Sequence, residues 1–160
     1  MFNRNRPTRR LRQSSDDGAR SRPSARSRSR PARFLLKTFI VEDSALILEN
    51  LIDTLEELSP VQVVGSAPDE ASAVAWLSTA GNHCELLIID VFLKAGTGLG
   101  VLRAAQSLGV SSKRVVLTNY ATKDMRAACH ALGADRVFDK SSEIEELLEY
   151  CEGLNDEATT

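Results

Sequence analysis

Five side chains that suit metal and phosphate chemistry each lie at the end of a short apolar run. Glu42 and Asp43 follow FIV, Asp90 follows LLII, Thr118 closes RVVLT, and Lys140 follows RVFD. Carboxylates bind hard cations, and a carboxylate can attack phosphorus as a covalent nucleophile. A hydroxyl and an ammonium stabilise negative charge on phosphoryl oxygens. The set suits phosphoryl transfer if the fold brings its members together.

The elements that must position these residues can be read from hydrophobic periodicity. From Phe34 onward, apolar runs alternate with stretches of helical spacing, and Ser44 is a candidate N-cap for the first helix. We expect strands at 37–41, 61–67, 85–90, 114–118 and 136–139, each followed by a helix, the last over 143–154. The expected fold is therefore an α/β, flavodoxin-like (βα)5 doubly wound domain with a five-stranded parallel sheet in the order 2-1-3-4-5.

This topology predicts that the five side chains converge. Ligands bind beyond the carboxyl ends of the strands in open sheets of this kind, and strands one, three, four and five are neighbours. Three crowded carboxylates repel one another, and a divalent cation removes that penalty. Mg²⁺ is the expected cofactor because it prefers oxygen, keeps several waters and often uses only one or two carboxylates.

Four segments in the right order resemble the receiver domain of bacterial response regulators. The resemblance covers residues 37–154 and is carried by FIVEDS, LLIIDVFLKAGTG, VVLTNYA and GADRVFDKS. It implies that Asp90 is the phosphoacceptor and that Thr118 and Lys140 contact the phosphoryl group. It also implies that Mg²⁺ is held by Glu42, Asp43, Asp90 and the backbone carbonyl of Phe92.

The resemblance further implies a role in two-component signalling. The phosphoryl donor would be a sensor histidine kinase or a phosphotransfer protein, and transfer would be catalysed by the receiver itself, which is no ordinary enzyme. About 20 residues follow Lys140, so we expect a stand-alone, cytoplasmic receiver that acts on a downstream protein whose identity the sequence does not give. A homodimer through the fourth helix, fifth strand and fifth helix is a further expectation.

Several positions depart from the family pattern. Lys94 and Ser141 stand where the family usually has proline, and Val137 stands where many members have an inward-turning aromatic residue. The aromatic residue is one place later, at Phe138, which strand alternation places on the opposite face. The usual coupling between threonine and aromatic ring is therefore not expected here, and Tyr120 is a candidate substitute.

Two bulky residues are expected to set the lifetime of the phosphorylated form. Phe92 and Tyr120 each lie two places after a site residue, where they would flank the path of attacking water. Neither carries a carboxylate or amide that could orient that water. We predict slow autodephosphorylation for this family.

The charge distribution divides the chain. Residues 1–36 hold 11 Arg against two Asp, a net charge of +9, while the remainder holds 9 basic and 20 acidic residues, a net charge of −11. Such asymmetry separates two kinds of segment. We assign an Arg/Ser/Pro-rich disordered arm to residues 1–34, the receiver domain to 35–155 and a short flexible tail to 156–160.

Three interpretations of the arm remain open. It could bind nucleic acid non-specifically through its arginines, which would make the chain a nucleic-acid-associated regulator and is the alternative function. It could be an organellar transit peptide, or a solvated extension without a selected role. The sequence has no apolar run of roughly 18 residues, so no membrane partner is expected.

An enzyme of flavodoxin-like fold is a third, weaker hypothesis. The first strand–helix turn, EDSALI, has no glycine-rich or hydroxyl-rich phosphate loop, which argues against a flavin. Cys84, Cys129 and Cys151 lack the spacing of a metal site and are odd in number, so the simple expectation is a reducing compartment.

Overall fold

The computed structural model describes residues 34–159. Apart from Phe34, the arm expected at residues 1–34 lies outside the described residues, as does Thr160. Within the described part of the chain, no helix is both long and apolar enough to cross a membrane.

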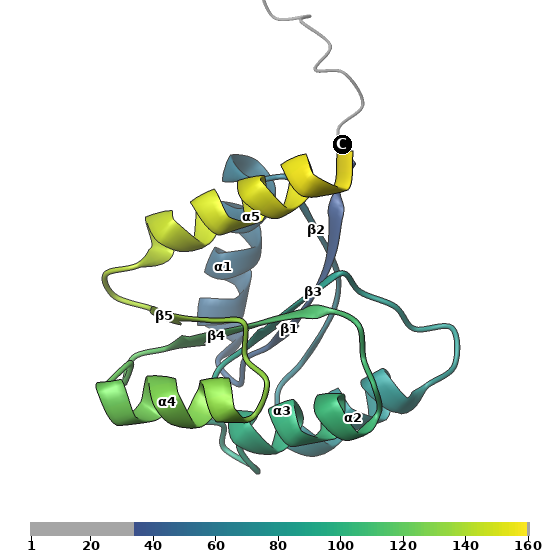
Figure 1. Cartoon of the computed structure of the whole chain (residues 1–160), viewed down its shortest axis with the longest axis vertical. Coiled ribbons are helices and arrows are strands. Elements are labelled where there is room, and N and C mark those ends of the chain that lie inside the picture. Colours follow the sequence, from purple (N-terminus) through teal and green to yellow (C-terminus); the bar gives the residue numbers. More distant parts are fainter. Residues whose placement is uncertain (1–33, 160) are drawn as a thin grey trace, which may run out of the picture. The chain divides into compact units, whose positions relative to one another are not determined.

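Five parallel strands form one sheet in the order β2-β1-β3-β4-β5, which confirms the predicted topology (Figure 1). All boundaries agree with the expected ranges to within one residue, because runs of aliphatic and β-branched side chains suit a sheet buried on both faces. The strands are β1 (Leu36–Val41), β2 (Val61–Ala67), β3 (Leu86–Ile89), β4 (Lys113–Thr118) and β5 (Arg136–Asp139).

Helices cover both faces of the sheet, with α1 and α5 on one side and α2, α3 and α4 on the other (Figure 1). They are α1 (Ala45–Leu58), α2 (Glu70–Ser78), α3 (Gly98–Ser107), α4 (Lys123–Ala131) and α5 (Ile144–Thr159). The tail expected from residue 156 is instead helical as far as Thr159. Asn155 is buried, so α5 is still packed against the domain where the tail was expected to begin.

Side chains that accept backbone N–H groups fix where four helices begin. The N-caps are Ser44, Asp69, Thr97 and Thr122, and each accepts a hydrogen bond from the residue three places ahead. Ser44 was predicted from the sequence. After α4, Gly133 adopts a φ of +94°, the left-handed conformation that ends a helix at little cost.

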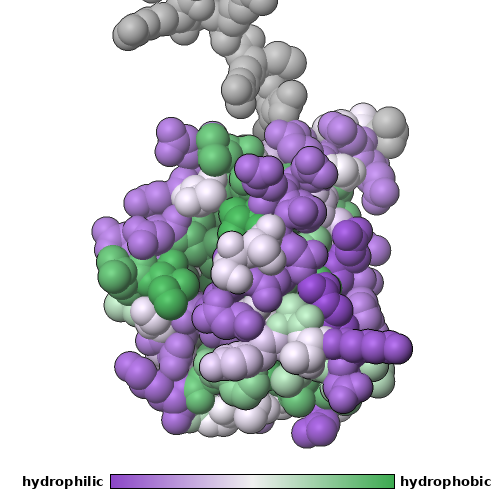
Figure 2. All heavy atoms as spheres, turned by 90° about the vertical axis from the view of Figure 1, so that its left-hand side faces the viewer, coloured by the Kyte–Doolittle hydropathy of each residue, from purple (hydrophilic) through white to green (hydrophobic). Residues whose placement is uncertain are grey.

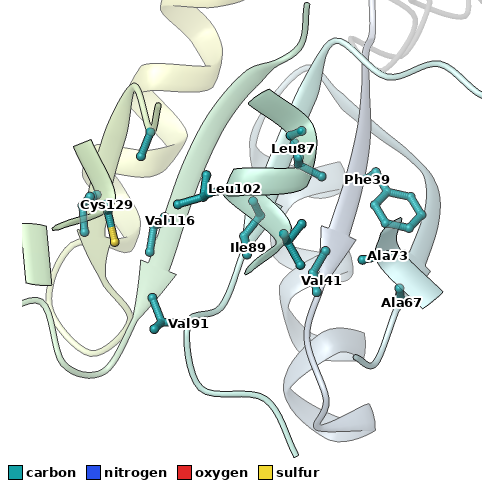
Figure 3. Close-up of a cluster of buried hydrophobic side chains, with 14 of the residues drawn as sticks. Phe39, Val41, Ala67, Ala73, Leu87, Ile89, Val91, Leu102, Val116 and Cys129 are labelled. Atoms are coloured by element: carbon teal, nitrogen blue, oxygen red, sulfur yellow. The ribbon is translucent and has the colours of Figure 1, made fainter. Parts of the chain in front are cut away.

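Strand alternation sorts the interior into two cores. Phe39, Ile89 and Val116 point toward α2, α3 and α4 (Figure 3), while their neighbours along the strands face α1 and α5. Val137 belongs to the first core and Phe138 to the second, so the predicted opposite orientation of these two side chains is confirmed.

All three cysteines of the chain are buried and free. Burial raises the pKa of the Cys84 and Cys129 thiols, and it raises the pKa of Cys151 to about 12. They behave as small apolar residues of the two cores rather than as reactive groups.

The surface is mixed in character. Hydrophilic side chains cover much of the face that carries α4 and the β5–α5 connection, and apolar side chains form small patches among them (Figure 2). Exposed apolar residues are ordinary when scattered in this way.

Candidate functional site

The acidic pair follows β1 at the carboxyl end of the sheet. Glu42 is buried, and its Oε1 accepts a hydrogen bond of 3.1 Å from the Ser44 backbone N–H. Asp43 is partly exposed. Since Ser44 is also the N-cap of α1, the start of this helix fixes the turn that holds both carboxylates.

Asp90 follows β3, the strand next to β1. The last residues of the two strands, Val41 and Ile89, are partners in the sheet, so Asp90 emerges beside the acidic pair. One oxygen atom from each of Glu42, Asp43 and Asp90 can be chosen so that all lie within 4.8 Å of one another. The predicted convergence of these three carboxylates is thus present in the structure.

Lys140 joins the cluster from the end of β5. Its Nζ lies 2.8 Å from Asp90 Oδ2 and 2.5 Å from Glu42 Oε2. Burial alone would lower the pKa of the Lys140 ammonium, but the hydrogen bonds to the two carboxylates raise it above its ordinary value. The lysine is therefore a fixed positive charge beside Asp90.

The charge balance of the cluster suits a divalent cation. Burial raises the pKa of Glu42 above its ordinary value, although the hydrogen bond from Lys140 opposes that shift. With all groups ionised, three carboxylates and one ammonium leave two negative charges in excess. A doubly charged cation that prefers oxygen ligands would neutralise them, so the donor set fits Mg²⁺.

Thr118 lies at the end of β4, between the strands that carry Asp90 and Lys140. The residue is fully buried, and its Oγ1 accepts a hydrogen bond of 3.3 Å from the Tyr120 N–H. Its backbone carbonyl accepts the Lys140 N–H at 3.0 Å. Strand order thus places the threonine and the lysine next to each other.

Two aromatic rings lie beside the carboxylate cluster. Phe92 and Tyr120 meet edge to face with ring centroids 5.0 Å apart, and the residues are 51% and 62% exposed. The Phe92 backbone N–H donates a hydrogen bond of 3.4 Å to Asp90 Oδ1, so the residue that carries this ring contacts the acidic residue directly. The contact between the rings was not anticipated from the sequence.

An arginine contact near the site could not be found by sequence reasoning. Arg126 of α4 donates to the carbonyls of Ala121 and Val137, and it forms an ion pair with Glu143. Glu143 also accepts the Asp139 N–H at 3.0 Å. This arrangement joins four segments that the sequence separates, so no local motif reveals it.

Comparisons with known proteins agree with the geometry. Residues 38–152 match the family described as the response regulator receiver domain. The chain is 32% identical over 112 residues to the two-component response regulator PhoP of Pseudomonas aeruginosa, an alignment that covers 70% of this chain and 48% of that protein. The chain thus spans about half the length of this curated relative.

Solved structures share the fold at low sequence identity. A LuxR-family DNA-binding response regulator from Staphylococcus aureus has a TM-score of 0.67 and 18% identity, covering 76% of this chain and 99% of that chain. The Francisella response regulator 1452 receiver domain has a TM-score of 0.68 and 18% identity, with coverages of 77% and 98%. The response regulator domain of Thermotoga maritima CheB has a TM-score of 0.66 and 16% identity, with coverages of 76% and 97%.

The family match, the identity to a curated relative and the shared sheet order point the same way. The match covers most of the described residues, and it includes every residue of the carboxylate cluster and Lys140. The chain therefore belongs to the response regulator receiver domain family of two-component signalling.

Proposed function

We propose that this receiver domain takes up a phosphoryl group on Asp90 and passes the signal on by phosphorylation-dependent contact with another protein. Members of the family are phosphoacceptors rather than enzymes in the ordinary sense. One observation carries the proposal: the Lys140 ammonium lies against the Asp90 carboxylate, next to two further carboxylates that suit a cation.

The proposed reaction is a displacement at phosphorus. A carboxylate oxygen of Asp90 attacks the phosphorus of a phosphohistidine, a P–O bond forms, and the P–N bond breaks as the imidazole leaves. The product is an acyl phosphate. Lys140, which contacts Asp90, is proposed to compensate the charge on the phosphoryl oxygens, and the Thr118 hydroxyl is proposed to donate a hydrogen bond to one of them.

Mg²⁺ belongs to the proposal as the cofactor. Receiver domains bind it at an acidic pocket, and Glu42, Asp43, Asp90 and the Phe92 carbonyl would hold it in this chain. When bound, the cation supplies positive charge that screens the phosphoryl oxygens from the incoming carboxylate.

The proposed donors are a sensor histidine kinase or a phosphotransfer protein, and the proposed target is a protein. A homodimer through α4, β5 and α5 is included, and sedimentation of the phosphorylated chain tests it. The alternative, nucleic-acid binding through the arm, concerns residues outside the described part of the chain. Deleting residues 1–33 and measuring salt-dependent DNA binding separates it from the main proposal.

We also propose that the phosphorylated form loses phosphate slowly. The Phe92 and Tyr120 rings contact each other beside Asp90, and neither side chain carries a carboxylate or amide that would orient an attacking water. A bulky aromatic pair at this position would hinder the approach of water while leaving the Asp90 carboxylate within reach of Lys140.

Intact mass measurement tests the phosphoacceptor. The chain is incubated with acetyl phosphate and Mg²⁺, and we expect wild type to gain the mass of one phosphoryl group. Asp90→Asn should gain none, because the amide is not nucleophilic. Asp53→Asn is the matched control, since it removes an exposed carboxylate of α1 and should be labelled like wild type.

Two results would contradict the proposal. Labelling of Asp90→Asn to the wild-type level would place the phosphoryl group elsewhere. If wild type were labelled equally in excess chelator, phosphorylation would not require Mg²⁺.

A further inference from the structure

Glu70, the first residue of α2, is joined to the loop that follows Asp90. Its Oε2 accepts the Thr97 backbone N–H at 2.8 Å, and its own N–H donates to the Ala95 carbonyl at 3.2 Å. The residue thus contacts both the middle and the end of the loop through hydrogen bonds of opposite direction. The two elements are 27 residues apart in the sequence at the first of these contacts.

Thr97, which donates to Glu70, is in turn paired with Phe92. Thr97 and Phe92 form an isolated antiparallel bridge, and Gly98 donates its N–H to the Val91 carbonyl at 2.9 Å. The first and last residues of the loop after Asp90 are therefore held together. Glu70 accepts the hydrogen bond from Thr97, and Thr97 pairs with Phe92, whose carbonyl is proposed as a metal ligand.

Two glycines make room for the Glu70 carboxylate. A Cβ added at Gly100 would lie 2.1 Å from Glu70 Oε1, and one added at Gly96 would lie 2.4 Å from Glu70 Cβ. Gly96 also has a backbone φ of +72°, a value that residues with a Cβ rarely adopt. The loop and the start of α3 thus form a close-fitting seat for this single side chain.

We propose that Glu70 is a positioning residue for the metal site: its carboxylate, seated on Gly96 and Gly100, fixes Thr97 and through it the Phe92 carbonyl. The inference rests on the proposed function, because it presupposes that this carbonyl is a Mg²⁺ ligand. Glu70 does not touch the metal in this account.

The physical reason is the exposure of the loop. Residues 94–97 are all exposed, so little apolar packing holds them in one conformation. A hydrogen bond from a backbone N–H to a carboxylate is charge-assisted and stronger than one between neutral groups. Groups that orient metal ligands without binding the metal commonly change affinity about 10- to 100-fold when removed.

The deciding experiment is a Mg²⁺ titration followed by backbone amide chemical shifts, with the melting temperature measured in chelator. We expect the Kd for Mg²⁺ to rise about tenfold in Glu70→Ala. Glu70→Gln keeps an oxygen that can accept the Thr97 N–H, so it should bind within about threefold of wild type. A role in stability alone would change melting temperature and leave the Kd unchanged.

Gly100→Ala gives a second route that removes no functional group. The added methyl displaces the carboxylate from its seat, while alanine favours helix α3 more than glycine does. We expect weaker Mg²⁺ binding without a lower melting temperature. If Glu70→Ala fails to fold, this variant decides the question.

The outcomes separate the two proposals. A wild-type chain that binds no Mg²⁺ sinks the proposed function together with this inference. A wild-type chain that binds Mg²⁺, with an unchanged Kd in folded Glu70→Ala or, failing that, in Gly100→Ala, overturns the role of Glu70 alone. A Glu70→Gln chain as weak as Glu70→Ala also overturns it, because the accepting oxygen would then be irrelevant.

Discussion

At the scale of single residues, the carboxylate cluster carries more negative charge than its lysine can balance. Lys140 contacts Glu42 and Asp90, whereas no hydrogen bond to the Asp43 carboxylate appears among the described residues. Charges of like sign within 4.8 Å destabilise the folded chain when no cation is bound. The clustered carboxylates should therefore lower the stability of the metal-free chain, a cost that is common where residues are arranged for function.

Removing the Asp43 charge should stabilise the metal-free protein. We expect Asp43→Asn to raise the melting temperature in chelator by roughly 2–5 °C, the shift of a stability gain of about 1 kcal/mol or less. Calorimetric melting of both proteins measures it. Asp53→Asn on α1 lies outside the cluster and should leave the melting temperature near wild type, and an equal rise there would point to general charge rather than to the site.

We expect the lifetime of the phosphorylated form to depend on Phe92. We expect Phe92→Asn to speed phosphate loss about five-fold, because an amide that orients the attacking water contributes about 1 kcal/mol to the barrier. The decay of phosphorylated protein after removal of the donor can be followed by mass spectrometry. Leu108→Asn, an exposed apolar residue at the end of α3, is the control and should decay like wild type.

At the scale of elements, Arg126 connects segments whose contact the sequence did not predict. Val137 stands where many members of the family have an aromatic residue, and its carbonyl accepts a hydrogen bond of 2.7 Å from the Arg126 side chain. The same guanidinium contacts the β4–α4 loop and Glu143 before α5. It therefore connects the segments that follow Thr118 and Lys140.

This ion pair should make stability depend on pH. The hydrogen bond from Arg126, followed by that from the Asp139 N–H, lowers the pKa of Glu143. A lowered folded-state pKa gives stability that is present above the unfolded value of about 4.3 and is lost as the pH falls through the folded value.

Urea unfolding of wild type and Glu143→Gln measures the effect. We expect wild type to be more stable by about 1 kcal/mol at pH 7, a modest value because both side chains are partly exposed to solvent. The difference should shrink toward zero in the acid window below pH 4. If the difference in the free energy of unfolding stayed constant across this pH range, the effect of Glu143 would come from packing rather than from its charge.

Much of the fold and of the site follows from local sequence patterns. Apolar runs predicted the five strands, and the residues that follow three of these runs predicted that Glu42, Asp43, Asp90 and Lys140 meet, because parallel strands end at one edge. Long-range side-chain contacts did not follow. Arg126 and Glu70 resemble any other charged residues of a helix until the tertiary structure shows which backbone groups they meet.

At the scale of the whole molecule, the proposed cation binding should be linked to folding. The cluster is assembled from the ends of β1 and β3 and is approached by Lys140 after β5, so unfolding separates its members. A ligand that binds only the folded state stabilises it by an amount set by the ratio of its concentration to Kd.

We therefore expect Mg²⁺ to protect the whole domain. At 100 times its Kd it should add roughly 2.7 kcal/mol to the free energy of unfolding. The gain should vanish in Asp43→Asn and on addition of chelator. Equal stabilisation of that variant would show that Mg²⁺ acts through screening of general surface charge, which an equal ionic strength of KCl would reproduce.

The burial of every native thiol makes the molecule convenient for spectroscopy. Cys84, Cys129 and Cys151 are shielded in the two cores and stay protonated at neutral pH, so maleimide reagents should ignore them in the folded state. A single cysteine introduced on the surface would then take up a fluorophore alone. The wild-type background can thus carry a dye beside α4, with no need to remove any native sulfur.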